Sequence, residues 1–374
     1  MTDAAPYLAH LEIHLDRIRR NYLFLQKKLA RGCDCAAAVK AEAYGLGADQ
    51  VVPELYAAGC RHFFVAHAGE GIRARAVLPE EAGKEKITGA QIYVLHGTTG
   101  AAAEDFLRHD LIPVLNSLGD IAAWAGAAKE KDKKLPAVIH LDTGMNRLGL
   151  PADEAAKLSA DLLQPLDVRY VMSHLACADE AGHPKNKEQL EKFRRLTGAL
   201  DLPARLSFAN SAGIFLGTDY HFDQVRPGCA LYGINPTPWQ TNPMQGVVTL
   251  RARILQIHEA AAGETVGYGA VYTARKTVKL ATISAGYADG LLRSFGKSGM
   301  VYIGGRACPL VGRVSMDLVV ADVTGVDVQV GDFAEIIGAH QTVDEVAAAA
   351  GTIGYEILTD LGKRYQRLYT GRDR

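Results

Sequence analysis

The chain has 374 residues, and its 41 Lys and Arg against 42 Asp and Glu give a net charge of -1. That balance argues against a nucleic-acid-binding surface, which usually carries a strong basic excess, and an apolar fraction of 48% argues against a disordered chain. The sequence lacks both the ~20-residue apolar run of a membrane span and the apolar segment of a signal peptide, and six cysteines without CxxC spacing suggest neither zinc nor disulfides.

We therefore expect a soluble, cytoplasmic protein of two or three domains. No metal site is expected, and neither a membrane nor a nucleic acid is expected as a partner.

The predicted elements begin with an apolar run at Leu11–Leu15. The helical pattern that follows brings apolar residues to one face, namely Ile18, Tyr22, Leu25 and Leu29. This run precedes the repeating pattern of the first half. We interpret it as an extra strand that could pair with the C-terminal domain.

From residue 36 to about 226, eight short apolar runs alternate with helical patterns. The runs are Ala36–Val39, His62–Ala66, Gln91–Leu95, Ile112–Leu115, Ala137–Leu141, Val168–Met172, Arg205–Phe208 and Gln224–Arg226. Helical spacing is clearest at Ala48–Ala58, Asp153–Leu163 and Asn186–Leu200. Eight strands separated by helices over ~200–250 residues favour a (β/α)8 barrel, and a doubly wound open sheet is the alternative.

A proline-rich stretch at Ile234–Gly246 predicts the linker between domains. After it, Val248–Ile254 alternates apolar and polar residues with the period of a strand. Further strands are predicted at Val278–Ile283, Met300–Ile303, Asp317–Val323 and Phe333–Ile337, and a capping box of Thr342 and Glu345 predicts a helix through Ala350. We expect a barrel domain over 1–240 and a mainly β domain over 241–374.

Polar side chains of catalytic type recur where the predicted barrel strands end, at the rim that carries the active sites of such barrels. They are Lys40, Arg147, His174, Asn210, Ser211 and Arg226, and a predicted turn at Gly228 and Cys229 lies at the same rim. Each has an ordinary alternative: a solvated lysine, a hydrogen-bonded histidine, a helix cap, a plain turn or an ion-pair arginine. Together they describe a lysine able to form a Schiff base beside backbone N–H groups able to hold a phosphate.

Several longer strings resemble one family, the alanine racemases, which are fold-type III pyridoxal-phosphate (PLP) enzymes. The resemblance runs nearly end to end. The strings are Val39–Gly47, Asp142–Gly149, Ser173–Ala176, Asn210–Ala212, Val225–Gly228, Val266–Gly269, Gly286–Gly290 and Gly312–Asp317. The barrel followed by a β domain agrees with that family's architecture.

The resemblance implies that Lys40 holds PLP as a Schiff base and then acts as one of two bases. Tyr268, delivered by the partner subunit of a homodimer, would be the other. Racemisation removes the Cα proton from one face and returns a proton to the opposite face, so two groups on opposite faces can do this without turning the substrate. Lys40 would act on D-alanine and Tyr268 on L-alanine.

The resemblance also implies the ligands. The cofactor phosphate would be bound by Tyr44, Ser211, Tyr355 and the backbone of Gly228 and Cys229, with Asn210 also in the cofactor site. His174 would lie under the pyridine ring and link Arg226 to Tyr268, and Arg226 would face the ring nitrogen. Arg147 and the partner's Met316 would bind the substrate carboxylate, and the partner's Tyr287 would line the entrance.

Three positions depart from the family pattern. His140 stands where many members carry a lysine, often carbamylated. Leu291 stands where a proline commonly follows the Gly286–Gly290 motif, and Lys363–Arg367 replaces the family's usual C-terminal motif. They leave a racemase of serine or lysine as an alternative. A PLP-dependent decarboxylase and a non-catalytic PLP-binding protein are further alternatives, disfavoured by Tyr268 and by the β domain. The implied role is to supply D-alanine for cell wall or to break alanine down.

Overall fold

The computed structural model describes residues 7–79, 89–200 and 202–372. The predicted domain spans, 1–240 and 241–374, therefore include residues that lie outside the described part. Contacts group Ile18–Gln245 into one compact unit, called here the barrel unit. The residues up to Arg17 join those from Gly246 onward in a second, called the strand unit.

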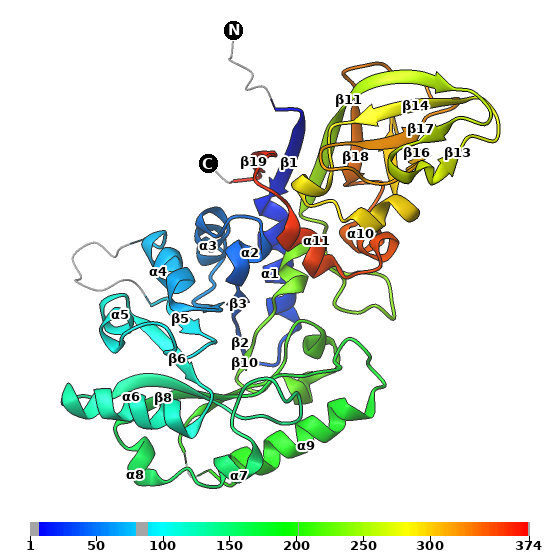
Figure 1. Cartoon of the computed structure of the whole chain (residues 1–374). Coiled ribbons are helices and arrows are strands. Elements are labelled where there is room, and N and C mark those ends of the chain that lie inside the picture. The colour runs from blue at the N-terminus through cyan, green and yellow to red at the C-terminus, as the bar shows by residue number, and fades with distance from the viewer. Residues whose placement is uncertain (1–6, 80–88, 201, 373–374) are drawn as a thin grey trace. The chain divides into compact units, whose positions relative to one another are not determined.

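The barrel unit contains one sheet of parallel strands (Figure 1). They are β2 (Asp34–Cys35), β3 (Ala37–Ala38), β4 (His62–Val65), β5 (Gln91–Val94), β6 (Leu111–Leu115), β7 (Leu135–His140), β8 (Leu166–Met172), β9 (Arg205–Ser207) and β10 (Gln224–Val225). β2 pairs with β10 and β3 pairs with β4. Between them, the Ala36 N–H donates to Val225 O at 2.9 Å. β2 and β3 thus act as one strand that closes an eight-stranded barrel, and the predicted fold class is confirmed.

Helices alternate with these strands. They are α1 (Leu15–Lys28), α3 (Ala48–Ala57), α4 (Ala68–Ala76), α5 (Ala103–Arg108), α6 (Leu118–Glu130), α7 (Ala152–Ala155), α8 (Ala160–Leu163) and α9 (Pro184–Gly198). The single helix predicted over Asp153–Leu163 was wrong, because the segment forms two short helices. The Ser159 hydroxyl accepts the Leu162 N–H and starts the second helix as its N-cap.

The strand unit is mainly antiparallel. Its strands are β1 (Ala9–His14), β11 (Val248–Ala260), β12 (Thr265–Val266), β13 (Tyr272–Thr273), β14 (Val278–Ile283), β15 (Met300–Ile303), β16 (Arg306–Pro309), β17 (Val319–Asp322), β18 (Phe333–Ile337) and β19 (Gln366–Thr370). β1 pairs antiparallel with β11 and parallel with β19. A register shift between Ile254 and Gln256 divides β11 into a half that pairs with β1 and β18 and a half that pairs with β14.

Two helices follow, α10 (Val343–Ala350) and α11 (Gly354–Asp360). The capping box predicted for α10 is confirmed: the Thr342 N–H donates to the Glu345 carboxylate at 2.7 Å, and the Glu345 N–H donates to the Thr342 hydroxyl at 3.2 Å.

Burial explains why the strands of the two units have different hydrophobic patterns in the sequence. All five residues of β6 are buried, because a parallel strand in a barrel is covered on both faces. β1 instead alternates buried and half-buried residues, the pattern of an antiparallel strand with one face on the core. Over residues 7–79, 89–200 and 202–372, the helices are all too short or too polar to cross a bilayer.

Candidate active site

The chain adopts an unusual backbone directly after the first barrel strand. Lys40 begins α2 (Lys40–Tyr44), and the four residues after Lys40 all have positive φ, at 52°, 55°, 53° and 57°. This is a left-handed turn of non-glycine residues, which costs about 1–2 kcal/mol per residue. Such strain persists only where surrounding contacts impose it, and it concentrates at functional sites. The turn lies between two predicted site residues, Lys40 and Tyr44.

The Lys40 ammonium is destabilised by its surroundings. Burial lowers the pKa of Lys40, the positive charge of Arg147 lowers it further, and the carboxylate of Glu70 opposes both effects. A lower pKa increases the fraction of neutral amine at pH 7, which is the form that attacks a carbonyl or accepts a proton. The site therefore prepares Lys40 for both roles predicted for it.

Arg226 is buried, with 5% of its surface exposed. Its guanidinium donates to the Ser207 hydroxyl at 2.5 Å and to the carbonyl oxygens of Ser173 and Phe208. These acceptors are all neutral, and burial lowers the pKa of Arg226 to about 9. Arg226 Nη2 also lies 3.4 Å from Nδ1 of His174. The predicted pair of Arg226 and His174 thus lies together at the ends of β10 and β8, which flank β9 in the sheet.

Two histidines beside Arg226 are held neutral. Burial and the charge of Arg226 lower the pKa of His174, and the same causes lower the pKa of His140 to about 3. The Asn116 amide group donates to the carbonyls of Leu95 and Val114 at 3.0 Å, so its oxygen is the atom that faces His140 Nδ1 at 2.8 Å. Because that oxygen can only accept, the His140 proton lies on Nδ1 and Nε2 carries a lone pair. His140, where the resemblance expects a lysine, is thus a neutral acceptor.

Arg147 lies on a loop that bulges from the rim between Leu141 and Leu150, which form a β-bridge. The Asp142 carboxylate shapes this loop by accepting the N–H groups of Gly144, Met145 and Asn146. Although burial opposes them, these bonds lower the pKa of Asp142. The loop presents the Arg147 side chain to solvent, where it is able to bind an anion.

Gln189 was missed by the sequence analysis. This fully buried residue of α9 donates to the Thr143 hydroxyl at 3.1 Å and to the His174 carbonyl at 2.9 Å, and it accepts the Ala176 N–H. It therefore joins the Arg147 loop to the His174 segment. The available signal was a pair of amides, Asn186 and Gln189, on the face of the predicted helix that also carries Leu190 and Phe193.

Of the residues predicted to bind a phosphate, Tyr44, Ser211, Gly228 and Cys229 converge on the loop after β10. The Ser211 hydroxyl accepts the N–H groups of Gly228 at 2.9 Å and Ala230 at 3.3 Å. A Cβ at Gly228 would lie 2.2 Å from the Tyr44 hydroxyl, so only glycine fits there. Two hydroxyls and a glycine turn at one point form a cradle suited to phosphate oxygens, which fits the phosphate of PLP. Cys229 begins the next turn, η3 (Cys229–Tyr232).

The helix cap considered for Asn210 and Ser211 belongs to Asn210. Its side-chain oxygen accepts the Gly213 N–H at 2.9 Å at the start of the 3-10 turn η1 (Ala212–Phe215), and its amide donates to Leu175 O. Asn210 thereby leaves the Ser211 hydroxyl for the Gly228 loop.

The other predicted site residues lie in the strand unit. Tyr268, 71% exposed, occupies the turn between β12 and β13. Tyr287 and Met316 lie on adjoining segments, because the Tyr287 N–H donates to Ser315 O at 3.0 Å and the Ala288 N–H donates to Met316 O at 2.9 Å. Tyr355, 41% exposed, lies on α11.

The segments of Tyr287 and Met316 share a further link that the sequence analysis missed. The Arg364 guanidinium donates to Asp289 at 2.7 and 2.8 Å and to Asp317 at 2.7 Å. These bonds raise the pKa of Arg364. Arg364 belongs to the C-terminal segment in which this chain departs from the family ending, and each aspartate lies one or two residues from a predicted site residue.

Known proteins were compared with the chain. The family described as "Alanine racemase, N-terminal domain" matches residues 13–236, and "Alanine racemase, C-terminal domain" matches residues 247–369. An alanine racemase of Methylobacterium nodulans is 47% identical, covering 99% of this chain and 98% of that relative. One of Rhodospirillum rubrum is 46% identical, covering 97% and 96%. The crystal structure of alanine racemase from Bartonella henselae with covalently bound pyridoxal phosphate is 42% identical, has a TM-score of 0.92, and covers 98% of this chain and 100% of that one.

Proposed function

This chain belongs to the alanine racemase family, and we propose that it interconverts L-alanine and D-alanine with PLP, exchanging the Cα proton between Lys40 and the Tyr268 of a second copy of the chain. The observation that carries the proposal is the combination, at one rim of the barrel, of Lys40 with a lowered pKa, the buried Arg226 with only neutral acceptors, and a turn suited to phosphate oxygens. Relatives at 46–47% identity over nearly the whole chain are named alanine racemases, which favours alanine over serine or lysine.

PLP, when bound, withdraws electrons from the amino acid and makes the Cα proton removable. The chain supplies the means to hold it. Tyr44, Ser211 and the turn at Gly228 and Cys229 would bind the phosphate, and the amine of Lys40 would form the covalent link. Tyr355 belongs to the strand unit, and its predicted phosphate contact stays a prediction.

Arg226 would set the protonation of the pyridine ring. A guanidinium has donors and no acceptor, so a ring nitrogen beside it stays unprotonated. An unprotonated ring is the weaker electron sink, which limits side reactions such as transamination. The hydrogen-bond acceptors around Arg226 are neutral, so its guanidinium is not held in an ion pair. It would therefore present N–H donors to the ring nitrogen.

The second base requires a second copy of the chain. Tyr268, Val271 and Met316 are 71%, 53% and 52% exposed, and they lie on turns of the same unit. Tyr268 and Val271 share one turn, and exposed apolar side chains that lie together are typical of an interaction surface. In a homodimer this surface would place Tyr268, Tyr287 and Met316 at the barrel rim of the partner. Lys40 would then accept the Cα proton of D-alanine, and Tyr268 that of L-alanine.

The cytoplasm is the compartment we propose. All six cysteines carry thiols, the form kept in a reducing compartment.

The first test follows the circular dichroism of L-alanine during incubation with PLP-saturated protein. We expect decay toward zero, and parallel incubations with L-serine and L-lysine rank the substrates. A flat trace with alanine but not with another amino acid would reassign the specificity, and flat traces throughout would refute the racemase proposal.

The two-base assignment is tested with Tyr268→Phe. We expect racemisation to fall by about 10²–10⁴-fold, the usual contribution of a general acid–base group, while the visible absorbance of bound PLP is retained. In D2O, exchange of the Cα hydrogen should persist for D-alanine and stop for L-alanine. Tyr302→Phe in β15 is the matched control. An equal loss of exchange for both enantiomers would contradict the assignment.

Complementation tests whether the site is shared. Lys40→Ala and Tyr268→Phe are expected to be inactive separately. Refolding them together should restore about a quarter of the wild-type activity, because half of the dimers are hybrids and each hybrid contains one intact site. No recovery in verified hybrid dimers would place both bases in one chain.

A further inference from the structure

Helix α4, which follows the neighbouring barrel strand β4, is hydrogen-bonded to the left-handed turn after Lys40. The Glu70 carboxylate accepts the Ala41 N–H at 2.7 Å through one oxygen and the Ala66 N–H at 2.7 Å through the other. The Glu70 side chain is 10% exposed. One carboxylate therefore spans the ends of two adjacent strands, and both of its oxygens are engaged.

The bond to Ala41 fills a gap in the turn's own hydrogen bonding. Within the turn, the Ala43 N–H donates to Val39 O at 2.9 Å and the Gly45 N–H donates to Ala41 O at 2.7 Å. The Ala41 N–H donates instead to Glu70, which lies 29 residues further along the chain. The strained turn is thus completed by a charged acceptor from outside it, and charge-assisted bonds of this kind are stronger than neutral ones.

A second carboxylate shows what Glu70 would do as a local cap alone. Asp120 of α6 accepts the N–H of Asn116, four residues earlier, at 3.0 Å. Glu70 makes the same bond to Ala66, also four residues earlier. Glu70 is one methylene longer, and its second oxygen reaches the residue next to Lys40. That extra bond goes beyond what capping requires.

We propose that Glu70 is a positioning residue that holds the turn Ala41–Tyr44 in its left-handed form and thereby aims the Lys40 amine and the Tyr44 hydroxyl at the PLP site. The Arg73–Glu42 ion pair at 2.7 Å is a second link from α4 to the same turn, but both side chains are about half exposed. Water and salt screen such a pair, so Glu70 carries the coupling. The role of the turn in PLP binding rests on the proposed function.

Geometry and charge are separable at Glu70. Glu70→Asp keeps the negative charge and recreates the Asp120 cap, but it is too short to retain the bond to Ala41. Glu70→Gln keeps the length of the side chain but loses its charge. Its single oxygen can accept only from one side, so one of the two backbone N–H groups would face the amide NH2, which cannot accept a hydrogen bond. Since Glu70 opposes the fall in the Lys40 pKa, the Gln variant should shift the Lys40 titration to lower pH. Asp120→Asn is the matched control.

The experiment measures PLP binding to the full-length apoenzyme by visible absorbance, the pH dependence of its condensation with PLP, and thermal unfolding without PLP. For Glu70→Asp we expect about tenfold weaker PLP binding, with an unfolding temperature within a few degrees of wild type and of Asp120→Asn. For Glu70→Gln we expect weaker binding and a condensation midpoint at lower pH. Asp120→Asn should bind PLP as wild type does.

PLP binding by Glu70→Asp equal to that of wild type would overturn the proposal, as would equal losses in Glu70→Asp and Asp120→Asn. Wild-type protein that neither condenses with PLP nor racemises alanine would instead refute the proposed function. Unfolding of Glu70→Asp before PLP is added would reassign Glu70 to the stability of the fold.

Discussion

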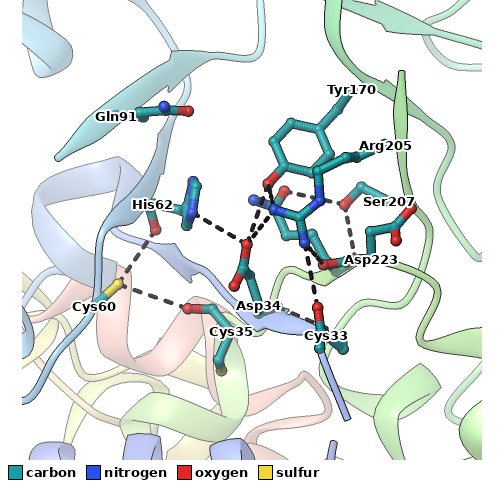
Figure 2. Close-up of polar contacts among 12 residues, drawn as sticks. Cys33, Asp34, Cys35, Cys60, His62, Gln91, Tyr170, Arg205, Ser207 and Asp223 are labelled. Atoms are coloured by element: carbon teal, nitrogen blue, oxygen red, sulfur yellow. Dashed lines mark hydrogen bonds and ion pairs between the residues drawn. The ribbon is translucent and has the colours of Figure 1, made fainter. Parts of the chain in front are cut away.

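The two ends of the barrel both gather an arginine, histidine and tyrosine, but their charges are arranged differently. At the end where the strands begin, the Asp34 carboxylate lies between Arg205 at 2.6 Å and His62 at 3.5 Å (Figure 2). Arg205 also donates to Asp223 O and lies over the Tyr170 ring. The charge of Arg205 is therefore matched by a carboxylate at this end.

At the rim where the strands end, the charges are less well matched: Arg226 donates to neutral acceptors, and Glu70 only partly offsets the effect of burial on Lys40. Burial lowers the pKa of Lys40 and lowers that of Arg226 to about 9. For Arg205, burial also opposes the charged form, but the bonds to Asp34 raise the pKa. The comparison teaches that compensated charge serves the fold, whereas uncompensated buried charge marks a place for an anionic ligand. A phosphate and a carboxylate are the ligands that PLP and alanine would bring.

The largest effect on the difference between the two ends is expected from removing Lys40. For Lys40→Ala we expect racemisation to fall by about a thousandfold or more, because the variant lacks both a base and the covalent link to PLP. Visible absorbance should be lost on dialysis. Lys187→Ala, on the exposed face of α9, is the control. Visible absorbance retained by dialysed Lys40→Ala would show that another residue holds the cofactor.

The cradle offers the next largest effect. In Gly228→Ala, the added methyl would lie 2.2 Å from the Tyr44 hydroxyl, so the turn or the tyrosine must move. We expect PLP affinity to fall by about tenfold or more, measured by absorbance titration of the apoenzyme. Gly182→Ala has open space around its Cβ and should bind PLP normally. Unchanged affinity in Gly228→Ala would remove this turn from the phosphate site.

The histidines at the two ends of the barrel are expected to differ in how they make stability depend on pH. The pKa of His140 is about 3 in the folded chain and about 6.5 when unfolded. The unfolded state binds more protons between these values. Stability therefore falls as pH drops below about 6.5, by up to about 1.4 kcal/mol per pH unit for this residue.

At the other end, burial lowers the pKa of His62 but Asp34 opposes the effect. Urea unfolding at pH 7, 6 and 5 should thus show a shallower pH dependence in His140→Asn than in wild type, and a smaller change in His62→Asn. Equal slopes in wild type and His140→Asn would mean that His140 is protonated in the folded state.

The smallest effect is expected at the beginning of the strands. Asp34 and Arg205 are 39% and 43% exposed, so solvent screens their ion pair. Arg205→Ala should cost about 1 kcal/mol of stability, less at high salt, with kcat unchanged. Urea unfolding measures the change in stability, and the racemisation assay measures kcat. A tenfold fall in kcat would show that this end also serves catalysis.

Much of the fold was predictable because its signals are local. The eight apolar runs became the eight barrel strands, and Lys40, Arg226 and His174 could be placed at one rim because parallel strands end together. The helix predicted over Asp153–Leu163 failed because the Ser159 cap outweighed the helical spacing. The bonds of Gln189 to Thr143 and of Arg364 to Asp289 could not be predicted because these partners lie 46 and 75 residues away in the chain.

The succession of strands and helices and the kinds of side chain at each strand end follow from the amino-acid sequence, because hydrophobic periodicity is a property of neighbouring residues. Only the tertiary structure decided the left-handed form of Ala41–Tyr44, since no local preference of Ala, Glu or Tyr favours it. The same holds for the proton position on His140, which depends on the Asn116 amide 24 residues away. Both depend on hydrogen bonds that form only when adjacent strands pair, β3 with β4 and β6 with β7.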